Sequence, residues 1–265
     1  MADKDFAVKG DILYAKTQNE ILCKPDAYII CRNGICEGVF DELPEKWRGI
    51  KLYDYTGQLI MPGMTDLHVH APQYTFRGLG MDLELLEWLQ VHTFPEEAKY
   101  QDIIYARQAY SYFTEDLKNS FTTRACIFAT LHREATLELM DQLEKTGLIT
   151  YVGKVNMDRN GSDELCEKSA EESAKDTQVW LDELAKRSYA RTMPILTPRF
   201  IPSCSDELMQ KLSEIQKEYK LRVQSHLSEN LSEIAWVKEL VPESSCYGQA
   251  YEMFDMLGDE TYPAI

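Results

Sequence analysis

The sequence has no long apolar run and no surplus of positive charge. No segment of its 265 residues approaches the ~18 consecutive apolar residues that a membrane-spanning helix requires, and the opening MADKDFAVKG is too polar for a secretory signal. Basic residues number 28 against 44 acidic residues, which gives a net charge of −16. Because a field of that sign repels phosphate backbones, we expect no nucleic-acid partner, although a free nucleobase is compatible with it.

The sequence also lacks closely spaced pairs of cysteines. The seven cysteines are scattered along the chain, and none forms a C-x-x-C motif. An odd number of scattered cysteines is typical of reduced thiols, so we expect a cytoplasmic protein without disulfides. The content of 44% hydrophobic and 27% charged residues is that of an ordinary globular protein and argues against disorder.

Residues 1–57 are predicted to form the N-terminal part of a small β-sandwich. They contain short apolar or β-branched runs separated by turns, at residues 6–14, 27–31 and 38–40. Asn33-Gly34 is a dipeptide typical of a hairpin turn. The segment offers too few strands for a complete domain.

Residues 58–265 show strand and helix patterns in alternation, which predicts an α/β domain with a parallel sheet. The expected strands are residues 59–64, 122–129, 149–155, 190–196 and 221–226, with helices between them and one helix starting near Ser203. These are about five of the eight units of a (β/α)8 TIM-type barrel, and residues 262–265 resemble the start of a sixth strand. Either the sheet is open and doubly wound, or the chain is the front part of a longer protein.

His68 and His70 follow the first strand of this domain in the motif Asp66-Leu67-His68-Val69-His70. Residues two apart in a strand point to the same side, so the two imidazoles can bind one metal ion. Solvent-facing or hydrogen-bonded histidines are the alternative.

His226 ends the fifth predicted strand and is therefore expected beside the first two histidines. Three imidazoles with one open position are typical of a catalytic metal centre. Glu229, three residues later, can serve as a general acid–base, or it can be a carboxylate at a helix entry. His92 and His132 are expected to be structural or surface residues.

The motif from Pro62 to His70 resembles the first-strand motif of the amidohydrolase superfamily, metal-dependent hydrolases with a (β/α)8 barrel. Within it, several further motifs are similar to those of the guanine deaminases and occur in the same order. They are Ala71-Pro72-Gln73-Tyr74, Asp82-Leu83, Leu86-Glu87-Trp88-Leu89, Thr93-Phe94-Pro95, Tyr151 to Asp158, Thr197-Pro198-Arg199-Phe200, Ser203-Cys204-Ser205 and Gln224 to Asn230.

This resemblance implies hydrolytic deamination of guanine to xanthine and ammonia, as in guanine catabolism or purine salvage. It implies one zinc ion per subunit on His68, His70 and His226, although imidazoles also suit iron. Glu229 would be the catalytic residue that moves protons between water, the purine ring and the departing amine. The substrate-binding residues would be His70, Gln73, Trp88, Arg199, Phe200 and His226.

Lys154 is expected to be structural, because the surroundings resemble those of enzymes with one metal ion rather than a metal pair bridged by a carboxylated lysine. The resemblance also implies a homodimer, a further active-site histidine after the sixth strand and an aspartate ligand after the eighth. Neither of these last two positions is present in the sequence. We therefore expect the 265 residues to have little deaminase activity by themselves. The alternatives are a different amidohydrolase that acts on an aminopurine or a triazine, and a non-catalytic fragment or split subunit.

Overall fold

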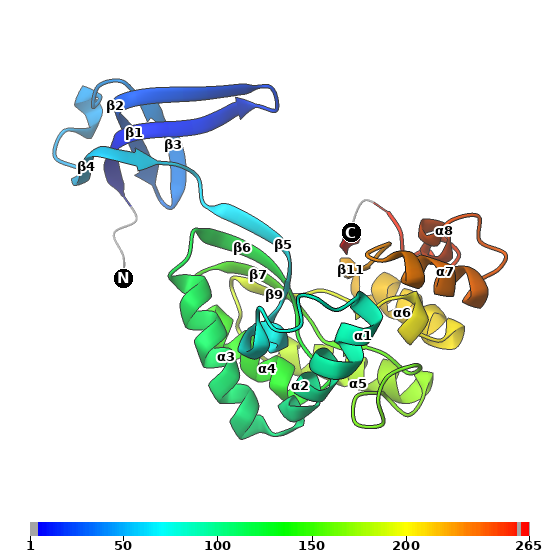
Figure 1. Cartoon of the computed structure of the whole chain (residues 1–265). Helices are drawn as coiled ribbons and strands as arrows, with labels where there is room; N and C mark the ends of the chain where they lie inside the picture. The colour runs from blue at the N-terminus through cyan, green and yellow to red at the C-terminus, as the bar shows by residue number, and fades with distance from the viewer. Residues whose placement is uncertain (1–4, 259–260, 265) are drawn as a thin grey trace. The chain divides into compact units, whose positions relative to one another are not determined.

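The structure is a computed structural model that describes residues 5–258 and 261–264. The chain divides into two compact units, Met1–Gly63 and Met64–Ile265, which are described separately (Figure 1). No helix in the described part of the chain is long and apolar enough to cross a membrane.

The first unit is a four-stranded sheet with the order β3-β2-β1-β4. Its strands are β1 (Phe6–Thr17), β2 (Glu20–Arg32), β3 (Ile35–Phe40) and β4 (Lys51–Ile60). The predicted hairpin turn joins β2 to β3, and both of its residues have a positive φ, 50° at Asn33 and 79° at Gly34. β1 pairs antiparallel with β2 and parallel with β4.

One strand prediction is wrong at this point. Leu59 and Ile60 were expected to begin the first strand of the α/β domain, but they end β4, where they pair with Asp11 and Ile12 of β1. Pro62 and Gly63 then separate β4 from β5, which begins at Met64. An apolar run does not reveal which of two sheets it joins, because its strand-forming pattern is the same in either sheet.

The second unit is an α/β fold whose strands all pair in parallel. Its main sheet has the order β5-β6-β7-β9, and two further strand pairs are β10-β8 and β11-β12. The strands are β5 (Met64–His70), β6 (Thr122–Phe128), β7 (Ile149–Gly153), β8 (Val155–Asn156), β9 (Thr192–Pro194), β10 (Thr197–Pro198), β11 (Val223–His226) and β12 (Thr261–Ala264). The parallel sheet and the predicted strand–helix alternation are confirmed.

Helices connect the parallel strands, as parallel pairing requires. They are α1 (Leu85–Trp88), α2 (Phe94–Ala98), α3 (Ile103–Lys118), α4 (Arg133–Glu144), α5 (Ala170–Ala185), α6 (Asp206–Tyr219), α7 (Leu231–Leu240) and α8 (Tyr247–Glu252). A π-helical turn, Leu89–Thr93, joins α1 to α2, and short 3-10 turns lie at Glu45–Trp47, Ala71–Phe76, Lys99–Gln101 and Ile201–Ser203.

The start of α6 differs from the prediction. Ser203 was expected near the first turn of this helix, but it ends the preceding 3-10 turn, and the cap is Ser205, whose side chain accepts a hydrogen bond from the Leu208 amide. Both serines are followed by acidic residues. The sequence pattern alone therefore does not distinguish them.

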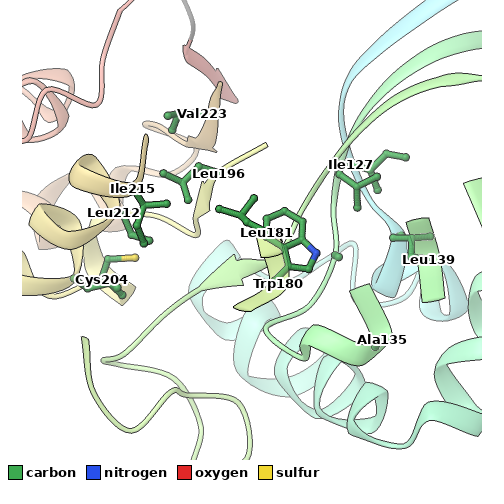
Figure 2. Close-up of a cluster of buried hydrophobic side chains, with 14 of the residues drawn as sticks. Ile127, Ala135, Leu139, Trp180, Leu181, Leu196, Cys204, Leu212, Ile215 and Val223 are labelled. Carbon is green, nitrogen blue, oxygen red and sulfur yellow. The ribbon is translucent and has the colours of Figure 1, made fainter. Parts of the chain in front are cut away.

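Most of the core lies between the sheet and the connecting helices. Figure 2 shows Trp180 and Leu181 of α5 between the side chains of Ile127 and Leu139 and those of α6. Trp180 is fully buried, and it is the largest of the fully buried side chains that the structure describes. Because α5 packs against both α4 and α6, its buried face holds neighbouring strand–helix units together.

Truncation of the Trp180 side chain should therefore destabilise the protein. We expect Trp180→Ala to lower the free energy of unfolding by about 3–5 kcal/mol, through lost burial and the cavity that remains. Urea denaturation measures this value. Tyr112→Ala is the control, because Tyr112 lies on α3 with 57% of its surface exposed, and it should change stability by no more than about 0.5 kcal/mol. Equal losses in the two variants would contradict the assignment of Trp180 to the core.

Candidate active site

Three histidines meet at the carboxyl ends of the parallel strands. His68 and His70 lie on β5, and His226 is the last residue of β11. One ring nitrogen from each lies within 4.8 Å of the others, so the group can hold a metal ion. Among the described residues, this group contains no carboxylate.

The hydrogen bonds of His226 fix which of its nitrogens faces the cluster. Its Nδ1 lies 2.6 Å from the carbonyl oxygen of Arg199, which can only accept, so Nδ1 carries the hydrogen. Nε2 then presents its lone pair, and it lies 2.9 Å from Nε2 of His70. Bound cations are commonly held by imidazoles oriented in this way by a backbone carbonyl. The donor set therefore fits a divalent ion that prefers imidazole nitrogen.

The three imidazoles are kept neutral by their surroundings. Burial, reinforced by His68, lowers the pKa of His226 to about 3. Burial also lowers the pKa of His70 well below its ordinary value, with His226 and His68 adding to the effect, and lowers that of His68. Neutral imidazole is the form that binds a metal ion.

Phe128, the last residue of β6, lies against all three rings. Its ring centroid is 4.9 Å from that of His68 and 4.5 Å from those of His70 and His226. This fully buried ring is apolar surface that excludes water from one side of the cluster.

The cluster opens into a cavity of about 240 Å³. That volume is small among ligand pockets, which span ~300–1,000 Å³, and it suits a ligand of few atoms. All eight residues predicted for the site line this cavity, namely His68, His70, Gln73, Trp88, Arg199, Phe200, His226 and Glu229. Leu85 and Leu89 add apolar surface that the sequence did not predict.

Arg199 follows β10 directly and is only 2% exposed. Its guanidinium forms a two-pronged ion pair with Glu97, with Nη1 at 2.6 Å from Oε2 and Nη2 at 3.2 Å from Oε1. Both partners of this ion pair are buried, so it is not a surface salt bridge. Gln73 also reaches Glu97, with its Nε2 at 3.4 Å from Oε1.

Aromatic rings form part of the cavity wall. Trp88 donates its indole N–H to the carbonyl of Leu79 at 3.0 Å, so its ring contributes mainly apolar surface. Phe200 is 5% exposed and meets the ring of Trp236 edge to face. Flat apolar walls of this kind suit an aromatic ligand.

Glu229 faces the cavity rather than capping a helix. The cap of α7 is Asn230, which forms a capping box with Glu233, and the backbone N–H of Glu229 donates to the same Glu233 carboxylate at 2.9 Å. Burial and the nearby charge of Glu233 raise the pKa of Glu229 to about 7, against a smaller opposite effect of Arg199. A carboxyl group that titrates near neutral pH can both accept and return a proton.

The remaining candidates lie apart from the metal-binding group. Lys154 is fully buried, and its Nζ donates to Glu167 at 2.6 Å, which fits the structural role expected for it. His132 precedes α4, where burial lowers its pKa to about 4. His92 stacks on Phe76.

Two important residues were not predicted. Phe128 is the next-to-last residue of the predicted strand 122–129, and its position near that carboxyl end was the available signal. Glu97 follows the motif Thr93-Phe94-Pro95 by two residues, but an acidic residue after a helix-starting proline is usually exposed. In this structure Glu97 is only 1% exposed.

A model of the amidohydrolase family matches residues 59–259 of the chain. Among curated proteins, guanine deaminase from Dictyostelium discoideum is 40% identical over 211 residues, 80% of this chain and 47% of its own length. Guanine deaminase from Homo sapiens is 41% identical over 207 residues, 78% of this chain and 46% of its own. The chain thus spans about half the length of these relatives.

Solved structures give similar results. A crystal structure of guanine deaminase from C. acetobutylicum, with guanine bound in its active site, superposes with a TM-score of 0.93 at 44% identity. The match covers 97% of this chain and 61% of that one. A triazine hydrolase from Arthrobacter aurescens has a TM-score of 0.78 at 16% identity, which reports on the fold alone.

Loss of one imidazole should weaken metal binding. We expect His226→Ala to reduce zinc affinity at least tenfold, by analogy with the ~10–100-fold effects of altered ligand surroundings. Competition with a chromophoric chelator measures the affinity. His92→Ala is the matched control and should bind zinc like the parent protein. If His226→Ala retained the parent affinity, the histidine group would not be the metal site.

The pKa of Glu229 predicts a pH-dependent effect on stability. As pH rises from about 4.5 to about 7, the unfolded chain releases this proton before the folded chain does, so the charge destabilises the folded state above that range. Glu229→Gln removes the charge. In metal-free protein it should raise the melting temperature by a few degrees at pH 8 and leave it unchanged at pH 4. A gain of equal size at both pH values would count against a raised pKa.

Proposed function

The chain belongs to the amidohydrolase family, and from this premise we propose that its cavity binds guanine and catalyses hydrolytic deamination to xanthine and ammonia. The observation that carries the proposal is a single small cavity lined by three neutral histidines, a carboxyl group that titrates near pH 7, and hydrogen-bonding side chains from Arg199 and Gln73. The similarity to guanine deaminases supports guanine as the substrate.

We propose zinc as the metal, held by His68, His70 and His226. Zinc suits imidazole nitrogen and commonly has three protein ligands in catalytic sites, which leaves a position for a reactant. When bound, it would supply hydroxide at neutral pH by lowering the pKa of water toward ~7.

The cavity residues would orient the base. Arg199 presents guanidinium N–H donors to oxygen or ring-nitrogen acceptors, and Gln73 presents a side-chain amide. Trp88 and Phe200 provide flat apolar surface on which a purine can rest. The small volume favours the free base over a nucleotide.

Glu229 is proposed as the residue that carries protons. In the overall reaction water adds its oxygen to C2 of guanine, and the bond from C2 to the exocyclic amine breaks. Glu229, ionised at the start, takes one proton from the water and gives it to the ring nitrogen N3. It then takes the remaining proton from the added hydroxyl group, which becomes the C2 carbonyl, and gives it to the departing amine, so ammonia leaves neutral and Glu229 is ionised again. Its pKa near 7 allows both transfers without a large energetic penalty.

Further proposals concern the fold, the cellular compartment and the oligomeric state. We propose that the parallel strands belong to a (β/α)8 barrel, that the N-terminal sheet is part of a small β-sandwich, and that the two compact units are these two domains. We also propose a reducing compartment such as the cytoplasm, which the odd number of scattered cysteines and the lack of a C-x-x-C motif support. A homodimer stays a prediction, which sedimentation of the purified protein would test.

The protein, expressed from its complete reading frame and loaded with zinc, should convert guanine to xanthine. Glu229→Gln should lower kcat by about 10²–10⁴-fold because the proton carrier is lost. For the parent protein, kcat/KM should fall as pH drops below about 7, where Glu229 becomes protonated. Absorbance of xanthine formation gives both results, and Glu239→Gln, on the C-terminal half of α7, serves as the control variant.

Turnover of a triazine or of adenine without xanthine formation from guanine would refute the proposed substrate. Full activity of Glu229→Gln would refute the role of Glu229. The 265-residue chain, assayed beside the complete protein, tests the separate prediction that these residues alone have little activity.

A further inference from the structure

Glu97 is a buried charge at the wall of the cavity, and the proposed reaction gives it no role. It lies on α2 with 1% of its surface exposed, and it does not itself line the cavity. Its two carboxylate oxygens contact the two terminal nitrogens of Arg199 at 2.6 and 3.2 Å. The guanidinium also lies 5.1 Å from the ring centroid of Phe94, on the same short helix. The orientation of Arg199 is therefore set from one element.

The same carboxylate also orients Gln73. The Gln73 amide nitrogen lies 3.4 Å from Oε1 of Glu97. A carboxylate paired with an arginine can only accept hydrogen bonds, so the amide must turn its nitrogen toward it. The Gln73 carbonyl oxygen is then directed away from Glu97. An amide whose orientation would otherwise be ambiguous becomes a defined acceptor.

We propose that Glu97 is a positioning residue that sets the hydrogen-bonding pattern of the cavity, with Arg199 as donor and Gln73 as acceptor. This pair complements a lactam edge, in which a ring carbonyl stands next to a ring N–H. The inference rests on the proposed function for one point, that the ligand is a purine. It adds that the cavity selects purines that carry this lactam edge.

A purely structural role explains the arrangement less well. Two buried charges cost several kcal/mol each in lost hydration, and well-packed apolar residues in their place are often equally stable. Glu96, the preceding residue, shows what a structural carboxylate on α2 looks like. It accepts hydrogen bonds from Thr75 and Lys99 at 2.7 and 2.6 Å and from Tyr105, and none of these three partners lines the cavity.

The test compares two ligands that cannot be deaminated because they have no exocyclic amine. Hypoxanthine has the lactam edge, and purine lacks it. Dissociation constants are measured by isothermal titration calorimetry on zinc-loaded protein from the complete reading frame. The readout is the ratio of the two constants, which an inactive or unfolded fraction of the sample does not change.

The parent protein should bind hypoxanthine at least tenfold more tightly than purine, as expected when a site built for hydrogen bonds meets a ligand that lacks them. Glu97→Gln should reduce this preference by about fivefold or more, because Arg199 and the Gln73 amide lose their shared anchor. Glu96→Gln, the matched control, should keep the parent ratio within about twofold. An unchanged ratio in Glu97→Gln, or no preference in the parent protein, overturns the proposal.

Glu97→Asp covers the case in which Glu97→Gln fails to fold. It keeps the buried negative charge, but its shorter side chain cannot reach both guanidinium nitrogens and the Gln73 amide. We expect an intermediate ratio, and a parent-like ratio would overturn the proposal. The binding readout also separates this inference from the reaction, since a lactam preference that depends on Glu97, without turnover of guanine, would refute only the proposed function.

Discussion

Parallel pairing of short strands is the constraint on which the site depends. Parallel strands must run in the same direction, so their carboxyl ends lie at one edge of the sheet, and helices fill the return paths. β5 ends at His70, β10 is followed by Arg199 and β11 ends at His226. Because the strands are short, each delivers one or two polar side chains before the chain turns away. A three-residue segment beyond β11 then brings Glu229 to the same cavity.

The sequence was sufficient for those parts of the site that depend on local periodicity. His68 and His70 share one side of β5 because side chains alternate along a strand, and the strand pattern was visible in the apolar residues around them. His226 could be placed because it ended another strand of the same type. The three histidines line the cavity for this reason, whereas Gln73, Trp88, Arg199 and Phe200 were predicted from the family resemblance and line the same cavity.

Residues that act through distant partners could not be found in this way. Glu97 and Arg199 are 102 positions apart, and no local pattern around Glu97 indicates that its carboxylate is buried. The assignment of Leu59 and Ile60 failed for a related reason, since the run is equally apolar whichever sheet receives it. Glu229 does not cap α7, because that cap is the next residue, Asn230. For Glu97 and for Leu59 and Ile60, the missing information was the identity of a tertiary neighbour.

The contact between His70 and His226 joins residues 156 positions apart. Closing a loop of this length costs entropy before any interaction rewards it, so the contact depends on the rest of the fold that holds the two strands together. The metal-binding group therefore exists only in molecules that have completed this closure. An ion that binds it selectively stabilises the native state by mass action, in proportion to the logarithm of its concentration over Kd. Metal supply would thus influence the fraction of the protein that is folded, in addition to any effect on turnover.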